Sequence, residues 1–87
     1  MSRKETGALM VIIQDLYPRY YANKTEDEIM RVISAWHSVL DDIDFEKAVD
    51  GLRYFVKESS YPPTVADIRA NVEPEYKYLA DIDLEEK

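Results

Sequence analysis

The strongest constraint on this chain of 87 residues is a pair of adjacent prolines in the segment Tyr61–Arg69. Neither proline fits inside a helix, because each lacks an N–H group and its ring clashes with the preceding turn. The first proline also moves Tyr61 out of the α region. A preceding helix must therefore end before Tyr61, and Thr64 is placed to cap a new helix with Asp67 in its first turn. The segment predicts a tight corner between two helices.

The composition predicts one small globular domain. A chain of this length buries a single modest core, and its hydrophobic fraction of 46% is typical of globular proteins. There is no cysteine, which excludes a disulfide framework and a thiolate metal site. The longest apolar run, Ala8–Ile13, is too short to span a bilayer. We therefore expect a cytoplasmic protein that does not associate with membranes.

The charge is strongly negative and unevenly spread. The net charge is −7, with +2 over residues 1–24, −5 over residues 25–58 and −4 over residues 73–87. A nucleic-acid-binding surface needs clustered Lys and Arg to neutralise phosphates. The acidic balance therefore argues against direct binding to DNA or RNA and favours a protein partner, such as one with a basic face.

Hydrophobic periodicity predicts four helices and no strand. Apolar residues recur at helical spacing over about residues 6–17, 26–40, 45–58 and 65–72. Pro18 should end the first helix, whose apolar stripe includes Val11 and Leu16. Tyr20 and Tyr21 then fall in a connector.

Polar residues mark the starts of the second and third helices. Thr25 and Glu28 have the spacing of a capping box, in which each side chain satisfies a backbone N–H group of the other residue. Asp44 is the expected cap of the third helix. Gly51 lies inside that helix and costs about 1 kcal/mol relative to alanine. It either allows another helix to approach closely or is a tolerated surface glycine.

The predicted fold class is therefore all-α: a small bundle of about four helices over residues 1–73, followed by an acidic C-terminal tail over residues 74–87. Pro74 separates the two parts. The tail has apolar residues among acids, and two interpretations remain open. It forms one more helix of two or three turns, or it is flexible and orders only on a partner.

No residue pattern points to catalysis, a cofactor or a metal. His37 is the only histidine, and no nucleophile is placed beside it by the sequence, so we interpret it as structural. The first ligand positions of a calcium loop are matched by Asp42, Asp44 and Glu46. The loop also needs glycine at its sixth position and glutamate at its twelfth, where this chain has Lys47 and Arg53. We expect a non-enzymatic protein without cofactors.

The aromatic residues have two interpretations. Trp36 is expected to anchor the core. A tyrosine most often lies half-buried in a core with its hydroxyl in water, yet tyrosine is also enriched at protein interfaces. One cluster follows the first helix and comprises Tyr17, Tyr20 and Tyr21; a second pair, Tyr76 and Tyr78, lies in the acidic tail, where little core remains for it to join.

Four motifs occur in a characteristic order. They are Leu16-Tyr17-Pro18, then Trp36 with Leu40-Asp41-Asp42, then the segment Asp44–Val49, and finally Tyr61–Arg69. In this order they resemble the small replicative-helicase loader and inhibitor proteins of bacteriophages that infect Gram-positive hosts. The resemblance spans roughly residues 8–70, and the Pro-Pro-Thr corner is its most specific part.

The resemblance implies an all-helical N-terminal domain followed by a flexible C-terminal region that binds the helicase. Proteins of this family bind a hexameric DnaB-like helicase, restrain its activity and deliver it to an origin-bound initiator protein, and they are not enzymes. Carried over to this chain, the partner-binding residues are Tyr76, Tyr78, Leu79, Ile82, Leu84 and Arg69. Family tails can run longer than residues 73–87 of this chain.

Two other functions fit the residues without the resemblance. The chain is also of a size and charge suited to a small phage regulator that captures a host transcription or replication protein. A structural oligomerisation domain that buries its tyrosine clusters is the other alternative. Otherwise we expect a monomer when the protein is free.

Overall fold

The computed structural model describes residues 1–72, which form five α-helices. They are α1 (Arg3–Leu16), α2 (Pro18–Tyr21), α3 (Glu26–Leu40), α4 (Phe45–Val56) and α5 (Val65–Ala70). Residues 1–72 contain no strand, and the fold is all-α as predicted. The predicted bundle of about four helices is confirmed, and the connector that follows Tyr17 adds the short helix α2.

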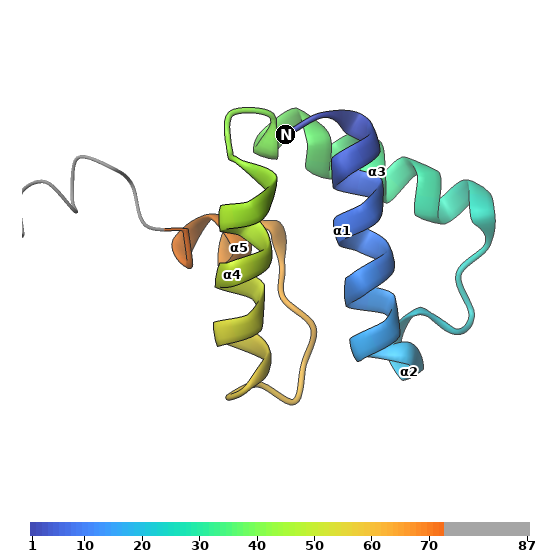
Figure 1. Cartoon of the computed structure of the whole chain (residues 1–87). Coiled ribbons are helices and arrows are strands. Elements are labelled where there is room, and N and C mark those ends of the chain that lie inside the picture. The colour runs from blue at the N-terminus through green and yellow to red at the C-terminus, as the bar shows by residue number, and fades with distance from the viewer. Residues whose placement is uncertain (73–87) are drawn as a thin grey trace, which may run out of the picture.

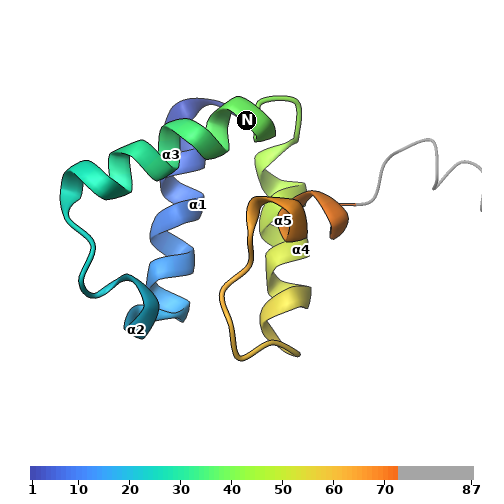
Figure 2. The same ribbon diagram turned by 180° about the vertical axis from the view of Figure 1, so that it is seen from behind.

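The helices pack in two layers. Helices α1 and α4 lie side by side and run in the same direction, and α3 and α5 cover them from one side (Figures 1 and 2). Helix α1 contacts both α3 and α4, while α5 contacts α4 and α3. The last helix thus ties the second layer to the first, although it is only six residues long. None of the helices in residues 1–72 is long and apolar enough to cross a membrane.

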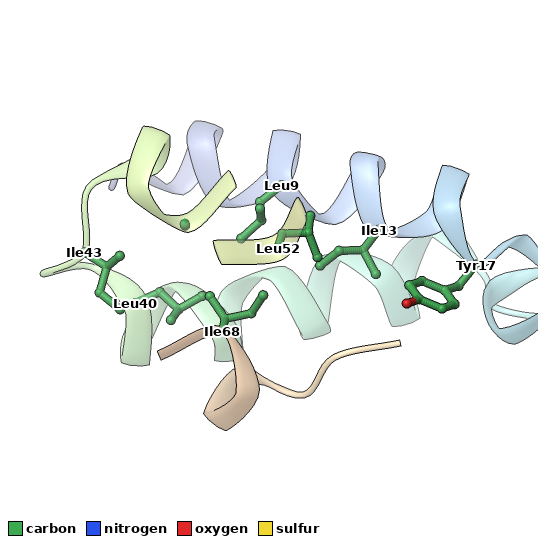
Figure 3. Packing of buried hydrophobic residues seen from close by; sticks show 8 residues of the cluster. Leu9, Ile13, Tyr17, Leu40, Ile43, Leu52 and Ile68 are labelled. Atoms are coloured by element: carbon green, nitrogen blue, oxygen red, sulfur yellow. The ribbon is translucent and has the colours of Figure 1, made fainter. Parts of the chain in front are cut away.

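The core lies between the two layers. Figure 3 shows a row of buried side chains that runs from Ile43 at one end to Tyr17 at the other. The complete cluster is Leu9, Ile13, Tyr17, Leu40, Ile43, Ala48, Leu52 and Ile68. Each fully buried Leu or Ile contributes about 1.5–3 kcal/mol relative to an exposed position. Trp36 packs against this cluster from its edge and is half-buried, so it supports the core without lying at its centre.

Reciprocal side-chain caps start three of the helices. In each case a hydroxyl accepts a backbone N–H bond from the third residue of the helix, and the carboxylate of that residue accepts one in return. The three pairs are Ser2 with Glu5, Thr25 with Glu28, and Thr64 with Asp67. Asp44 caps α4 with its carboxylate, as predicted, by accepting from the backbone N–H of Lys47 at 3.3 Å. The box at Ser2 extends α1 to Arg3, whereas the apolar pattern predicted a start near residue 6.

The structure corrects other predicted helix boundaries and the predicted burial of two apolar side chains. Pro18 is the first residue of α2, a position where its fixed φ suits a helix and its missing N–H costs nothing. Helix α4 ends at Val56 and α5 at Ala70, each about two residues earlier than expected. Val11 and Leu16 are 54% and 48% exposed, so only one side of the wide apolar stripe of α1 is covered.

Gly51 is a point where α4 and the end of α5 come very close together. It is buried, and a Cβ atom built on it would lie 2.6 Å from the backbone oxygen of Asn71. Real Cβ atoms essentially never come that close to another atom. Of the two interpretations of this glycine, close helix approach is therefore confirmed, and tolerance on the surface is wrong.

Candidate protein-binding surface

Arg69 is the only one of the predicted partner-binding residues that lies within residues 1–72. One guanidinium nitrogen donates to the backbone oxygen of Val39 at 2.7 Å and to the Asp42 carboxylate at 2.8 Å, and the other nitrogen donates to the same carboxylate at 3.2 Å. This two-pronged pairing ties α5 to the C-terminal end of α3, where a cation suits the helix dipole. Both side chains remain substantially exposed to solvent.

The ion pair shifts the pKa of both partners. The hydrogen bonds from Arg69 lower the pKa of the Asp42 carboxyl, because they favour its charged form. Asp42 in turn raises the pKa of the Arg69 guanidinium. The charged forms of the pair are therefore maintained at neutral pH. The five other predicted residues, Tyr76, Tyr78, Leu79, Ile82 and Leu84, lie outside the described residues.

Tyr17 fixes the connector between α4 and α5. Its ring is buried, and its hydroxyl donates a hydrogen bond to the backbone oxygen of Ser59 at 2.9 Å. Burial raises the pKa of this phenol, which therefore stays protonated and keeps its donor. Ser59 also orients the next turn, because its hydroxyl contacts both the backbone N–H and the backbone oxygen of Tyr61. For Tyr17 the expectation of a hydroxyl in water is wrong.

Two further tyrosines stack outward from this anchor. The ring centroids of Tyr17 and Tyr20 are 6.4 Å apart at an interplanar angle of 70°, and those of Tyr20 and Tyr61 are 5.9 Å apart at 61°. Both are edge-to-face contacts, which aromatic rings prefer. Tyr20 is 46% exposed and Tyr61 is 68% exposed. The three rings thus extend from the core to the surface, and the buried ring of Tyr17 supports the exposed rings of Tyr20 and Tyr61.

Tyr54 adds a third exposed ring at the same end of the molecule. It is 77% exposed on the last turn of α4, with the Lys57 ammonium 6.0 Å from its ring centroid. Helix α2, the end of α4 and the start of the following connector all lie at this end, opposite the loop that joins α3 to α4 (Figures 1 and 2). We call the surface of Tyr20, Tyr54 and Tyr61 the tyrosine end.

The sequence alone predicts only part of the tyrosine end. The sequence places Tyr20 in a cluster of tyrosines and Tyr61 at a corner between helices, but the contact between the two rings depends on the fold. Tyr54 was missed, although a large aromatic residue on the otherwise charged face of α4 is itself a signal. Arg69, by contrast, binds at the α3–α4 loop and is not part of the tyrosine end.

The described residues hold no arrangement typical of a reactive or metal-binding site. His37 is half-buried on α3. Within residues 1–72, no three His, Cys, Asp or Glu side chains come close enough to hold a metal ion. In the same part of the chain, every buried polar side-chain atom has a hydrogen-bond partner. What the described surface does offer is exposed aromatic rings and two exposed ion pairs, Arg69 with Asp42 and Lys24 with Glu28, and exposed rings suit contact with another macromolecule.

A comparison with models of protein families decides the assignment. The model of the N-terminal domain of the phage SPP1 helicase loader and inhibitor matches residues 1–69, which is most of the chain. The chain belongs to this family. It is a family of phage helicase loaders and inhibitors, and it is not a catalytic family. Searches among curated proteins and among solved structures gave no match.

The family match covers nearly all of the described structure. It includes the N-terminal caps of α1, α3, α4 and α5, the tyrosine end, and the Arg69–Asp42 ion pair. It ends at Arg69, so the predicted partner-binding residues of the tail lie beyond it. The resemblance found on the Tyr-Pro, Leu-Asp-Asp and Pro-Pro-Thr motifs is therefore confirmed at the level of the family.

Proposed function

We propose that this protein is a non-enzymatic adaptor that binds a hexameric DnaB-like replicative helicase, restrains its activity and helps to load it at a phage origin. The observation that carries the proposal is the family match over residues 1–69, because the family is one of phage helicase loaders and inhibitors. The exposed, anchored rings of the tyrosine end support a role in protein binding. An origin-binding initiator protein is the proposed second partner.

We place the helicase contact in the acidic tail, residues 74–87, with residues 1–73 as the domain that carries it. The tail places Tyr76, Leu79 and Ile82 at intervals of three residues among acids, a pattern that suits a groove with a basic rim. Arg69 lies five residues before the start of the tail and contributes one exposed cation to the proposed contact. The free protein acts as a monomer in the cytoplasm of the bacterial host.

Inhibition of the helicase ATPase tests this proposal. We expect the wild-type chain to lower ATP hydrolysis by a DnaB-type helicase from the phage or its host. Replacing Tyr76, Leu79 and Ile82 together by alanine should abolish that effect, because the anchors of the tail are removed. Met30→Ala is the matched control, since Met30 is an apolar side chain that is 50% exposed on α3, outside the tail.

Three results bear on the proposal. Inhibition that survives the triple substitution moves the contact from the tail to the described domain. Inhibition that Met30→Ala also removes points to a loss of folding rather than of a contact, and circular dichroism of that variant separates the two. A wild-type chain that leaves ATP hydrolysis unchanged and forms no complex with the ring contradicts the adaptor function itself.

A further inference from the structure

The tyrosine end combines exposed aromatic rings with three cationic side chains. Arg19 lies on α2 beside Tyr20, Arg53 precedes Tyr54 on the last turn of α4, and Lys57 caps the C-terminal end of that helix. Within residues 1–72, none of these three cations forms an ion pair with a carboxylate. In a chain with a net charge of −7, such a surface is the natural site for an acidic segment that carries apolar side chains.

The chain supplies such a segment itself. Residues 73–87 contain six acidic residues against two lysines, interspersed with Tyr76, Tyr78, Leu79, Ile82 and Leu84. They start where α5 ends, and this point is fixed on α4 because Asn71 packs directly against Gly51.

Tyr54 lies one helical turn beyond Gly51 towards the tyrosine end. At a rise of about 1.5 Å per residue this displacement along α4 is only about 5 Å. An extended segment of fifteen residues spans up to about 50 Å, so the length of the segment allows it to follow α4 and to reach Tyr61 and Tyr20 as well.

We infer that residues 73–87 dock in cis on the tyrosine end. Their apolar side chains contact the rings of Tyr54 and Tyr61, and their carboxylates pair with Arg53, Lys57 and Arg19. This docking does not depend on the identity of any external partner. Its consequence does rest on the proposed function: a tail held on its own domain must leave the tyrosine end before it engages the helicase, so the domain and the helicase compete for the same segment.

Paramagnetic relaxation enhancement in the full-length protein tests the docking directly. The chain has no cysteine, so Ala80→Cys gives a single attachment site for a nitroxide label. We expect amide signals of residues 19–20 and 53–61 to lose at least about half of their intensity relative to the sample with reduced label. Signals of Arg3 and Lys4, at the other end of α1, should keep theirs. The effect should weaken in high salt, which screens exposed charges.

Two charge reversals of equal size supply the control. Arg53→Glu with Lys57→Glu should restore the lost signals, while Arg3→Glu with Lys4→Glu should leave the losses unchanged. All four side chains are exposed, so both variants are expected to fold, and the dispersion of their amide signals checks this. Restoration in the first variant alone supports docking that is specific to the tyrosine end.

Three results overturn the inference. One is the absence of selective signal loss at residues 19–20 and 53–61. Another is a loss that persists after Arg53→Glu with Lys57→Glu. The third is a loss of equal size when label and isotope are on different molecules, because the segment then docks on a second copy of the chain. No helicase is present in any of these samples, so failure here is distinct from failure of the adaptor proposal.

Discussion

Replacing each of the two glycines by alanine should change stability in opposite directions. Both lie inside helices with negative φ, Gly7 in α1 and Gly51 in α4, so alanine gains about 1 kcal/mol of helix propensity at either site. At Gly7 the new methyl group would meet only the Ile33 side chain, at 3.9 Å, which is ordinary contact. Gly7→Ala should therefore stabilise the fold by about 1 kcal/mol.

At Gly51 the same methyl group would lie 2.6 Å from the backbone oxygen of Asn71 and 3.0 Å from its carbonyl carbon. Backbone cannot rotate away as a side chain does, so α5 must shift from α4. Overpacking of this kind costs about 1–3 kcal/mol and outweighs the gain in propensity. At the middle of that range we expect a net loss of about 1 kcal/mol, and thus a difference of about 2 kcal/mol between the two variants.

Urea and thermal denaturation followed by circular dichroism measure this difference. For a domain of this size each 1 kcal/mol corresponds to about 4–8 °C in Tm, so the two variants should be separated by about 8 °C or more. Equal stabilisation by both substitutions would refute the close approach of α5 to α4 at Gly51. A lower Tm for both would refute the ordinary van der Waals contact expected between a methyl group at position 7 and Ile33.

Three smaller effects are expected. Tyr17→Phe should lower the free energy of unfolding by about 0.5–1.5 kcal/mol, because it deletes the hydrogen bond to Ser59; an unchanged urea midpoint would contradict this. Thr64→Ala should cost about 1 kcal/mol through loss of the α5 cap, whereas Thr64→Ser should be nearly neutral. Arg69 lowers the pKa of Asp42 from about 3.8. The stability given by this ion pair is therefore present above that pH, and it is lost as the pH falls through the pKa that Asp42 has in the folded protein. Asp42→Asn should therefore lower the urea midpoint at pH 7 and converge with wild type in strong acid; a constant difference would count against the pair.

Local signals in the sequence were sufficient for most helix positions. A Thr or Asp followed by acids marks the starts of α3, α4 and α5, because these side chains satisfy the free N–H groups of a first turn. Ser2 and Glu5 carry the same signal, and it marks the start of α1 better than the apolar stripe does. Pro18 predicts the end of α1, and it also occupies the first position of α2, which proline favours.

Burial was harder to predict wherever both sides of a helix are apolar. Periodicity placed Leu16 and Val11 with Leu9 and Ile13, but α3 and α4 cover only one side of α1. The buried state of Tyr17 depends on Ser59, which lies 42 residues away along the chain. Contacts of that kind are set by the fold, and no local pattern reports them.

For the candidate surface, too, the sequence predicts local features but not the contacts between distant segments. The segment Tyr61–Arg69 predicts that Arg69 lies in a helix capped by Thr64. The hydrogen bonds of Arg69 to Asp42 and Val39 could not be predicted, because they depend on the packing of α5 against α3. The tyrosine end is likewise assembled from three segments, and only the tertiary structure brings Tyr20 within 5.9 Å of Tyr61. The helicase contacts proposed for Tyr76, Tyr78, Leu79, Ile82 and Leu84 rest on the sequence alone.

Sedimentation velocity of the full chain mixed with a hexameric DnaB-type helicase, in the presence of ATP, tests the adaptor function most directly. A protein of 87 residues sediments far more slowly than such a ring, so the bound and free forms separate clearly. We predict that a saturable fraction of the chain moves with the helicase. If the chain sediments at its own rate with helicases from both the phage and its host, the adaptor function is contradicted.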